Sequence, residues 1–233
     1  MKIIHITSVH SLFDVRIFHK QALSLYKRGH EVHLIIASNE EYSGIYSGVV
    51  VHVVGKNNNK YFRFFSTGLS IFLKSLSIKG DIFHFHDPEL IPWFLLLKLF
   101  RRRVVMDVHE NYANQILGKK WMPKLFRIFF SKLVYLFEYL AVNTFEGVVT
   151  TDSELTQSFK NLSNKTTIIT ANNFPIIDAD ILAANFSINK YKKNIVLSLG
   201  GINKARCADI LIQALPCIEN INYKILMGGN END

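Results

Sequence analysis

The sequence predicts an α/β protein whose main part is a doubly wound parallel sheet with helices on both faces. Short apolar segments rich in β-branched residues alternate with segments of helical periodicity over the first 170 residues, a pattern typical of parallel strands joined by crossover helices. The alternation restarts near residue 191 and stops after two strands and one helix. The 233 residues are 48% hydrophobic and 20% charged, so the chain can bury a sizeable core. We therefore expect one doubly wound domain followed by an incomplete second domain.

Seven segments of the first part are expected to form strands, because each is a short apolar run bounded by polar or turn residues. They are residues 2–7, 31–37, 49–55, 81–86, 103–109, 147–151 and 166–170. Between the first two strands the spacing predicts a helix that ends at Gly29, a residue suited to a left-handed cap. The apolar stripe of this helix consists of Val15, Phe18, Ala22, Leu25 and Tyr26.

Basic residues lie beside aromatic and aliphatic ones in segments 60–80 and 124–142, and the formal net charge is +8. In the second segment, polar residues at helical spacing leave a wide apolar face. The polar positions are Lys124, Arg127, Ser131, Tyr135 and Glu138, and the apolar positions are Phe126, Phe129, Phe130, Leu133, Phe137 and Leu140. We expect this apolar face to pack against the core; the alternative is a surface helix that contacts anionic lipid headgroups. Nucleic acid is not expected as a partner, because no binding motif for it occurs.

The chain is expected to divide at a turn-rich connection over residues 172–190, which contains Pro175. Residues 1–171 then form the first domain, and residues 191–233 begin a second one, with strands at 194–200 and 223–229 and a helix at 205–218. Two strands and one helix are too few to bury a doubly wound core. The chain is therefore expected to be cut off inside its second domain.

A cytoplasmic location is expected from three features. The N-terminus carries polar residues at once, unlike a secretory signal. The longest apolar run, residues 90–100, contains Lys98 and is too short to span a bilayer. The two cysteines, Cys207 and Cys217, form neither a disulfide framework nor a zinc signature.

Ligands of an open parallel sheet bind outside the carboxyl ends of its strands, and "HFHDPEL", residues 84–90, lies at such an end. Asp87 suits a helix N-cap, a proline follows it, and Glu89 falls in the first turn, where the helix dipole favours a carboxylate. Local structure thus explains these residues. It leaves His84 and His86 unexplained.

The next strand also brings a histidine to this edge. In "VVMDVHEN", Val105, Asp107 and His109 share one face, and Glu110 follows. A histidine at this place either acts on a substrate or has a structural role. In "TDSE", Thr151 and Glu154 match a capping box, which favours a structural interpretation there.

The start of the second domain offers a place for a diphosphate. No dinucleotide fingerprint follows the first strand and no P-loop occurs, which removes the main support for nicotinamide chemistry and nucleoside triphosphate hydrolysis. Glycines and cations before the start of a helix can instead hold a diphosphate. These residues are Gly200, Gly201, Lys204 and Arg206.

Together these segments resemble the N-terminal part of glycosyltransferase family 4, retaining enzymes of the GT-B fold that use nucleotide diphosphate sugars. The resemblance rests on "FDVRIFHKQALSLYKRGHEVHLI", "DIFHFHDPELIPWFLLLKL", "VVMDVHENYANQIL", "NNFP" and "LSLGGINKAR", in this order. It covers nearly the whole chain, and the first three blocks are typical of a bacterial surface-polysaccharide branch. The resemblance implies two Rossmann-like domains that face a cleft, the first binding mostly acceptor and the second mostly donor.

The resemblance also implies roles for single residues. His109 would face the donor sugar as the catalytic residue. The implied acceptor-side residues are Asp14, Arg16, His86, Asp87, Glu89 and Glu110, and the implied donor-binding residues are Gly200, Gly201, Lys204 and Arg206. No metal and no cofactor are implied, because side-chain cations and helix N-termini neutralise the leaving diphosphate in this fold.

The expected function is transfer of a sugar from a nucleotide sugar to a lipid-linked saccharide in surface polysaccharide biosynthesis. The enzyme would be peripheral, bound to the anionic inner face of the cell membrane. Two departures from the family's motifs argue against transferase activity of this chain by itself. Cys207 replaces a usual glycine, and the family's two glutamates spaced by seven residues do not occur before Asp233. The alternative is a noncatalytic acceptor- or membrane-binding remnant without a donor site.

Overall fold

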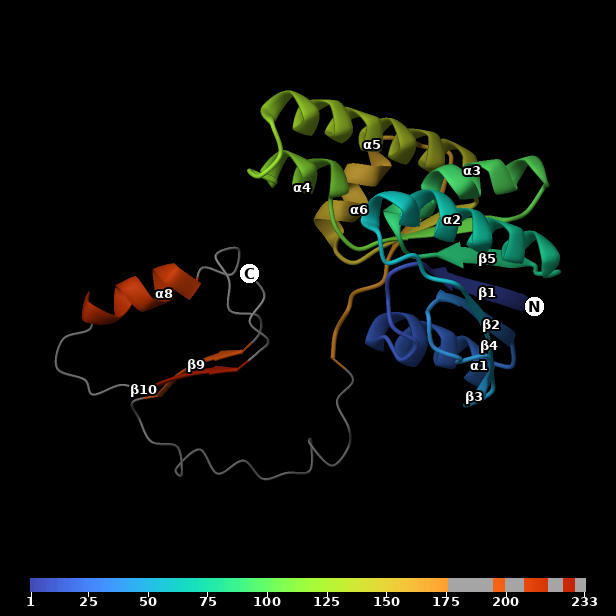
Figure 1. The fold of residues 1–233 in the computed structure, drawn as a ribbon, viewed down its shortest axis with the longest axis horizontal. Helices are drawn as coiled ribbons and strands as arrows, with labels where there is room; N and C mark the ends of the chain where they lie inside the picture. The colour runs from blue at the N-terminus through green and yellow to red at the C-terminus, as the bar shows by residue number, and fades with distance from the viewer. Residues whose placement is uncertain (176–194, 200–207, 218–223, 229–233) are drawn as a thin grey trace. The chain divides into compact units, whose positions relative to one another are not determined.

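The computed structural model describes residues 1–175, 195–199, 208–217 and 224–228. The chain divides into two compact units, Met1–Phe174 and Pro175–Asp233. The first unit is a mostly parallel sheet with helices on both faces (Figure 1), so the predicted α/β fold is confirmed. The predicted boundaries at residues 171 and 191 stay predictions, since most of the connection lies outside the described residues.

The sheet of the first unit has eight strands in the order β3-β4-β2-β1-β5-β6-β7-β8, and only β3 runs antiparallel to its neighbour. The strands are β1 (Lys2–Thr7), β2 (Glu31–Ala37), β3 (Gly44–Tyr46), β4 (Val49–Val54), β5 (Ile82–Phe85), β6 (Val104–Val108), β7 (Gly147–Thr150) and β8 (Thr167–Thr170). Seven of them match the predicted segments. The short strand β3 was not predicted. It reaches β4 through Ser47 and Gly48, both at positive φ, as a tight hairpin requires.

The strand order reverses between β1 and β5. From β1 the chain moves outward to β2 and β4, returns to pair β5 with the other side of β1, and continues outward to β8. At such a switch point the loops after the two central strands diverge and leave a crevice. The polar residues that follow β1, β5 and β6 are therefore brought together.

Helices α2 (Lys60–Ser77), α3 (Ile91–Leu99), α5 (Lys124–Thr144) and α6 (Ser153–Lys160) cover one face of the sheet (Figure 1). Two short helices accompany them: the 3₁₀ turn η2 (Pro88–Leu90), which precedes α3, and α4 (Tyr112–Gly118), which packs on α5. The core under this layer includes Ile4, Phe83, Phe85 and Phe94, all fully buried.

The other face is covered over β2 and β4 by one helical segment, the π-helix η1 (Val15–Ala22) continued by α1 (Leu23–Lys27). Gly29 follows at φ 83°, so the predicted left-handed cap is confirmed. The predicted stripe is only partly right, because Phe18 and Ala22 are buried whereas Val15 is 58% exposed. A π-helix has more residues per turn than the assumed α-helix, which moves Ile17 into the core and Val15 out of it.

The prediction that the aromatic face of α5 packs on the core is wrong. The helix buries Ser131, Glu138, Ala141 and Val142. Most of the predicted apolar face is exposed instead, including Phe129 at 60%. Apolar side chains surround most of this helix, so their spacing does not determine which side packs, and the buried side carries small residues that permit close helix contact.

The second unit contains the predicted strand, helix and strand. They are β9 (Ile195–Leu199), α8 (Ala208–Ala214) with the 3₁₀ turn η5 (Leu215–Cys217), and β10 (Lys224–Gly228). Strands β9 and β10 pair in parallel, as expected for strands joined by a crossover helix. In the described parts of both units, no helix has the length and apolar character that crossing a membrane requires.

Candidate functional site

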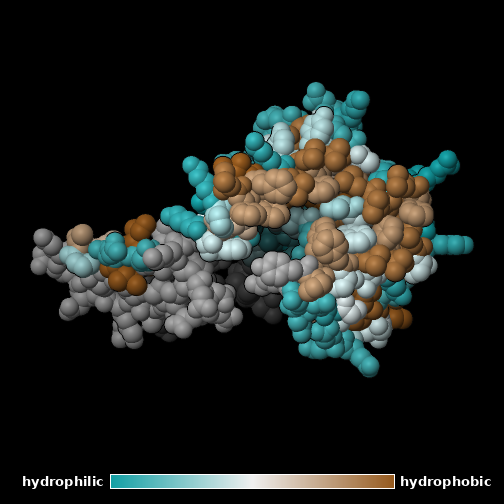
Figure 2. Space-filling view, turned by 45° about the horizontal axis from the view of Figure 1, so that its top comes forward, coloured by the Kyte–Doolittle hydropathy of each residue, from teal (hydrophilic) through white to brown (hydrophobic). Residues whose placement is uncertain are grey.

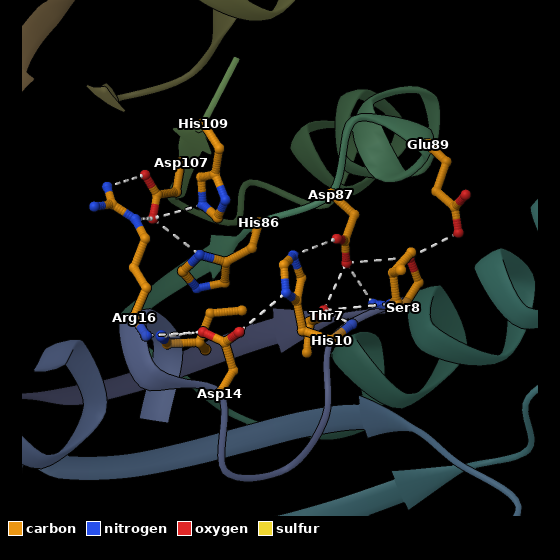
Figure 3. A network of polar contacts seen from close by, with 12 residues as sticks. Thr7, Ser8, His10, Asp14, Arg16, His86, Asp87, Glu89, Asp107 and His109 are labelled. Carbon is orange, nitrogen blue, oxygen red and sulfur yellow. Dashed lines mark hydrogen bonds and ion pairs between the residues drawn. The ribbon is translucent and has the colours of Figure 1, made fainter. Parts of the chain in front are cut away.

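The loops after β1, β5 and β6 converge at the carboxyl edge of the sheet and form one polar network with the start of η1 (Figure 3). The predicted acceptor-side residues Asp14, Arg16, His86, Asp87 and Glu89 all belong to it, and so does His109. The exposed Glu110 hydrogen-bonds Gln115 of α4 instead. The predicted residues other than Glu110 thus meet at the carboxyl edge of the sheet.

Asp107 is the second-last residue of β6 and the centre of the network. Its buried carboxylate accepts two hydrogen bonds from Arg16, from Nη2 to Oδ1 (2.7 Å) and from Nε to Oδ2 (3.0 Å). Nδ1 of His86 lies 3.0 Å from Oδ2, and Gln21 Nε2 donates to the same oxygen (2.6 Å). Asp107 therefore links η1, β5 and β6 through side chains.

The electrostatics of this group are those of a permanently charged pair. Burial alone would raise the pKa of Asp107, but the imidazoles of His109 and His86 and the guanidinium of Arg16 hold this pKa well below its usual value. Arg16 is also buried, and its Nη1 donates to the Ala171 carbonyl (2.9 Å). All three guanidinium nitrogens thus have protein partners, so Arg16 is placed to position the network rather than to reach an acceptor.

His86 is also the end of a row of three histidines on one face of the sheet. Its Nε2 lies 3.1 Å from Nδ1 of His5 on β1, and His84 stacks on it with ring centroids 4.8 Å apart. Burial, followed by the nearby imidazoles, lowers the pKa of His5 well below 6.5. Burial likewise lowers the pKa of His84 to about 3, so both rings are neutral at pH 7.

The side chain of Asp87 does not cap the helix that follows it, contrary to the local interpretation. The residue has extended N-cap geometry, but its buried carboxylate points to the loop after β1. Oδ2 accepts from Thr7 Oγ1 (2.7 Å), from the Ser8 backbone N–H (2.5 Å) and from Ser8 Oγ (3.2 Å), and His10 Nε2 lies 3.4 Å from Oδ1. Asp87 thus fixes the β1 loop at the switch point.

Asp14 begins η1 as its N-cap. Its Oδ1 accepts from the backbone N–H groups of Arg16 (2.8 Å) and Ile17 (2.9 Å), and its Oδ2 lies 3.2 Å from His10 Nδ1. Burial alone would raise the pKa of Asp14, but the hydrogen bond from Ile17 and the His10 imidazole lower it. His10 therefore bridges Asp14 and Asp87 across the site.

His109 lies at the mouth of the network, with 18% of its side chain exposed. Its Nε2 is 3.3 Å from Asp107 Oδ2, an ion-pair distance at which the geometry falls short of a hydrogen bond. Its backbone carbonyl accepts from Thr151 Oγ1 (3.1 Å). The predicted capping box at Thr151 is therefore wrong, and Asp152 caps α6 through Leu155 N–H (2.8 Å); an aspartate one position later competes for the same role.

Glu89 connects the polar edge to a hydrophobic pocket. It accepts from Ser8 Oγ (2.8 Å) and from Arg63 Nη2 (2.9 Å) and Nε (3.1 Å). It also lines a pocket of about 540 Å³ between α2, α3, α4 and α5. Most other lining residues are apolar, among them Phe64, Phe65, Ile91, Ile116, Phe130, Val134 and Phe137. A ligand with a polar head and an apolar tail fits this arrangement.

Two groups of side chains in the described part of the chain have the spacing of metal ligands: His5 with His84 and His86, and His86 with Asp107 and His109. In the second group, Asp107 is already paired with Arg16. The predicted donor residues Gly200, Gly201, Lys204 and Arg206, with Cys207, lie outside the described residues.

The sequence interpretation placed Ser8 and His10 at the edge after the first strand without a role for either, and it did not identify Thr7, Gln21 and Arg63. Asp107 was placed on the face of His109 but without a role. A carboxylate at an inward position of a buried strand needs a partner, so the strand pattern alone indicates that Asp107 is bound by other side chains. Arg63 is 26 positions from Glu89 and had no such local signal.

Comparison with known proteins agrees with the architecture. The model of Glycosyltransferase Family 4 matches residues 15–170, which include Arg16, His86, Asp87, Glu89, Asp107 and His109 but not the site residues from β1 to Asp14. No curated protein sequence matches the chain.

Three of the similar solved structures illustrate the likeness. Sucrose-phosphate synthase from Thermosynechococcus elongatus has a TM-score of 0.64 at 10% identity, over 97% of this chain and 61% of that one. A ugt transferase from Siraitia grosvenorii in complex with UDP has a TM-score of 0.59 at 8% identity, over 99% of this chain and 65% of that one. The catalytic domain of Starch Synthase IV from Arabidopsis thaliana, bound to ADP and acarbose, has a TM-score of 0.58 at 13% identity, over 98% of this chain and 68% of that one. The chain thus spans about two thirds of the length of these three, and the likeness is one of fold.

Proposed function

Because this chain belongs to glycosyltransferase family 4, we propose that it takes part in sugar transfer from a nucleotide diphosphate sugar to a saccharide acceptor. The observation that carries the proposal is the network at the switch point, where His109 stands at the mouth and Asp107 orients it from a buried pair with Arg16. The solved structures with UDP and ADP support a nucleoside diphosphate as the leaving group. No metal or cofactor is proposed for the transfer.

In this proposal His109 holds the donor sugar. Retaining transfer requires the sugar to be fixed while charge develops on the leaving diphosphate. A partly exposed imidazole can form a hydrogen bond with a sugar hydroxyl, and the Asp107 carboxylate beside its Nε2 favours one orientation of the ring. Gly200, Gly201, Lys204 and Arg206 are proposed to contact the diphosphate.

The acceptor is proposed to be a lipid-linked saccharide. The pocket beside Glu89 is large enough for part of a lipid chain and opens next to the polar edge. The saccharide would then lie at the residues after β1 and β5, and the lipid among the helices. The proposed process is surface polysaccharide assembly, and the proposed location is the inner face of the cell membrane, where such an acceptor would be met.

The outer surface of the helical layer supports a membrane contact. Figure 2 shows hydrophobic side chains gathered on this side of the first unit. The exposed ones on α2 and α5 include Phe62, Phe65, Leu69, Leu73, Leu125, Phe126, Phe129, Phe130, Leu136 and Leu140. So large an exposed apolar surface is typical of an interaction site, and the basic residues Lys124, Arg127 and Lys132 on α5 favour anionic lipid.

A transfer assay tests the proposed function. The purified chain is incubated with membrane extract and a panel of radiolabelled nucleotide diphosphate sugars, and label is counted in the lipid fraction. We expect incorporation from one donor. If no donor is bound or used while the chain still binds membranes, the second candidate holds, a noncatalytic acceptor- or membrane-binding module, for which the pocket and the exposed helices suffice.

Binding to anionic liposomes is expected to depend on α5. Each basic residue near the surface contributes about 1 kcal/mol and is weakened by salt. The double variant Leu125→Ser with Phe129→Ser should sediment less with anionic vesicles than the unsubstituted protein. Ile45→Ser on β3 is the matched control, because Ile45 is 73% exposed on another element. Equal sedimentation of the double variant and the unsubstituted protein would rule out this contact, and equal sedimentation with neutral and anionic vesicles would rule out the preference for anionic lipid.

His109→Ala is expected to lower turnover on the order of 100-fold while changing the free energy of unfolding by less than about 1 kcal/mol. The ring is partly exposed and lacks a well-aligned hydrogen bond, so little stability depends on it. Steady-state transfer and urea unfolding are measured side by side, with the exposed His19→Ala as control. Equal losses of turnover and stability would assign His109 a structural role.

A further inference from the structure

Three histidines occupy adjacent positions on one face of the sheet, and one of them, His86, also belongs to the site network. His5 on β1 is directly paired with His84 on β5, and His86 follows two residues later on the same face. Ring centroids lie 4.9 Å apart for His5 and His84 and 5.3 Å apart for His5 and His86. All three side chains are buried. Three imidazoles so close in a sheet interior contribute little apolar packing, so they require another explanation.

The carboxylate of Asp107 determines which nitrogen of His86 faces the other two. Nδ1 of His86 lies 3.0 Å from Asp107 Oδ2 and therefore carries the proton that this carboxylate accepts. Nε2 of His86 is left with the lone pair, which accepts a hydrogen bond from Nδ1 of His5 at 3.1 Å; an ion bound by His86 would replace this hydrogen bond. A histidine that donates one ring N–H to a carboxylate and offers its other nitrogen is the usual arrangement of a metal ligand.

Two further nitrogens in this cluster have no partner among the described residues: Nε2 of His5 and Nε2 of His84. Buried polar atoms are nearly always hydrogen-bonded, and an exception indicates a water molecule or an ion. One nitrogen from each of the three rings lies within 4.8 Å of the others. Nitrogens that share a tetrahedral ion at about 2.0–2.1 Å are roughly 3.4 Å apart, so a small rotation of the rings would bring them into coordination.

From this geometry we propose that His5, His84 and His86 bind one divalent transition-metal ion of the zinc type. Imidazole nitrogens are common ligands of such ions. The ion joins β1 to β5 directly below the switch point and leaves the open edge to substrate. It has no part in the transfer chemistry, and the proposal does not depend on the proposed function.

Metal titration of the full chain tests the proposal. The protein is stripped with chelator, titrated with Co²⁺ and followed by the ligand-field absorption of the ion, and Zn²⁺ is then added in competition. We expect one Co²⁺ per chain, displaced by Zn²⁺, and affinity at least about tenfold lower for His84→Asn. His52→Asn is the matched control, because His33 and His52 also lie in contact (2.8 Å) on neighbouring strands but without a third histidine.

Three results would overturn the proposal. The first is the absence of stoichiometric Co²⁺ binding, which would assign the two nitrogens to water. The others are an equal loss of metal affinity in His52→Asn and a spectrum that shows sulfur as a ligand of the ion. If His84→Asn does not fold, X-ray absorption of the zinc-loaded unsubstituted protein decides without a variant. We expect the scattering of three imidazole ligands, and fewer than three would contradict the site.

Discussion

Asp107→Asn is expected to lower the free energy of unfolding by about 3–5 kcal/mol, because it leaves the buried guanidinium of Arg16 without a counter-charge. Both side chains of this pair are almost completely buried, at 6% and 0% exposure. An amide can replace one hydrogen bond but not the charge. His86 and Gln21 lose a charged acceptor at the same time. Urea unfolding of the full chain at pH 7 measures the loss.

The chain contains a matched control for this prediction. Arg63 and Glu89 form a second two-bond pair, but their side chains are 22% and 23% exposed. Arg63→Gln should therefore cost about 1 kcal/mol or less, whereas Arg16→Gln should cost as much as Asp107→Asn. The double variant of Arg16 and Asp107 should lose clearly less than the sum of the single losses. Additive losses, or equal losses for the two arginines, would contradict the central role of the buried pair.

The pH dependence follows from the direction of the Asp107 pKa. Its folded-state pKa is held well below 3.8, so the unfolded chain takes up the proton first as pH falls. The contribution of Asp107 to stability is complete above the unfolded pKa and is lost only as pH falls through the lower folded pKa. The difference between the unsubstituted protein and Asp107→Asn should thus stay constant from pH 7 to about pH 5. A difference that shrinks within this range would contradict the depressed pKa.

The sheet could be predicted almost strand for strand, because a parallel strand buried on both faces is an apolar run that local sequence reveals. Strand β3 was not predicted, because its three residues Gly44–Tyr46 are too few to show an alternation of apolar and polar positions. The edge that carries the site was also predictable, because His86 and His109 each directly follow the last residue of a strand. Which helix face packs was not predictable for α5, which is apolar nearly all round.

The partners of the site residues could not be predicted, because they are distant in sequence. Local rules assigned Asp87 to a helix cap, and its backbone does adopt that position. Its carboxylate nevertheless binds Thr7 and Ser8, about 80 positions earlier. Two hydroxyls and a backbone N–H presented by the β1 loop outcompete the single N–H that a short 3₁₀ turn offers. Such a choice depends on the strand order β1 beside β5, which the sequence pattern does not contain.

Glu138→Gln is expected to stabilise the protein at pH 8 and to have little effect near pH 4.5. Glu138 lies on the buried side of α5 with 5% exposure, and its Oε1 has no partner in the part of the chain that the structure describes. Burial raises its pKa from 4.5 to about 7, because the charged form loses its hydration. Between these two values the folded state holds a proton that the unfolded state has released. Stability therefore falls as pH rises through this window and stays low above it.

The expected gain at pH 8 is on the order of 3 kcal/mol, because each pKa unit corresponds to about 1.4 kcal/mol. Glutamine keeps the shape of the protonated acid and carries no charge at any pH, so the variant should lack the fall in stability that the unsubstituted protein shows between about pH 4.5 and 7. Urea unfolding at pH 4.5, 6 and 8 follows both proteins, and Glu154→Gln, an exposed carboxylate in the first turn of α6, should leave the pH profile unchanged. If the Glu138→Gln profile runs parallel to that of the unsubstituted protein, the carboxylate has found a partner or water, and α5 does not bury a charge at neutral pH.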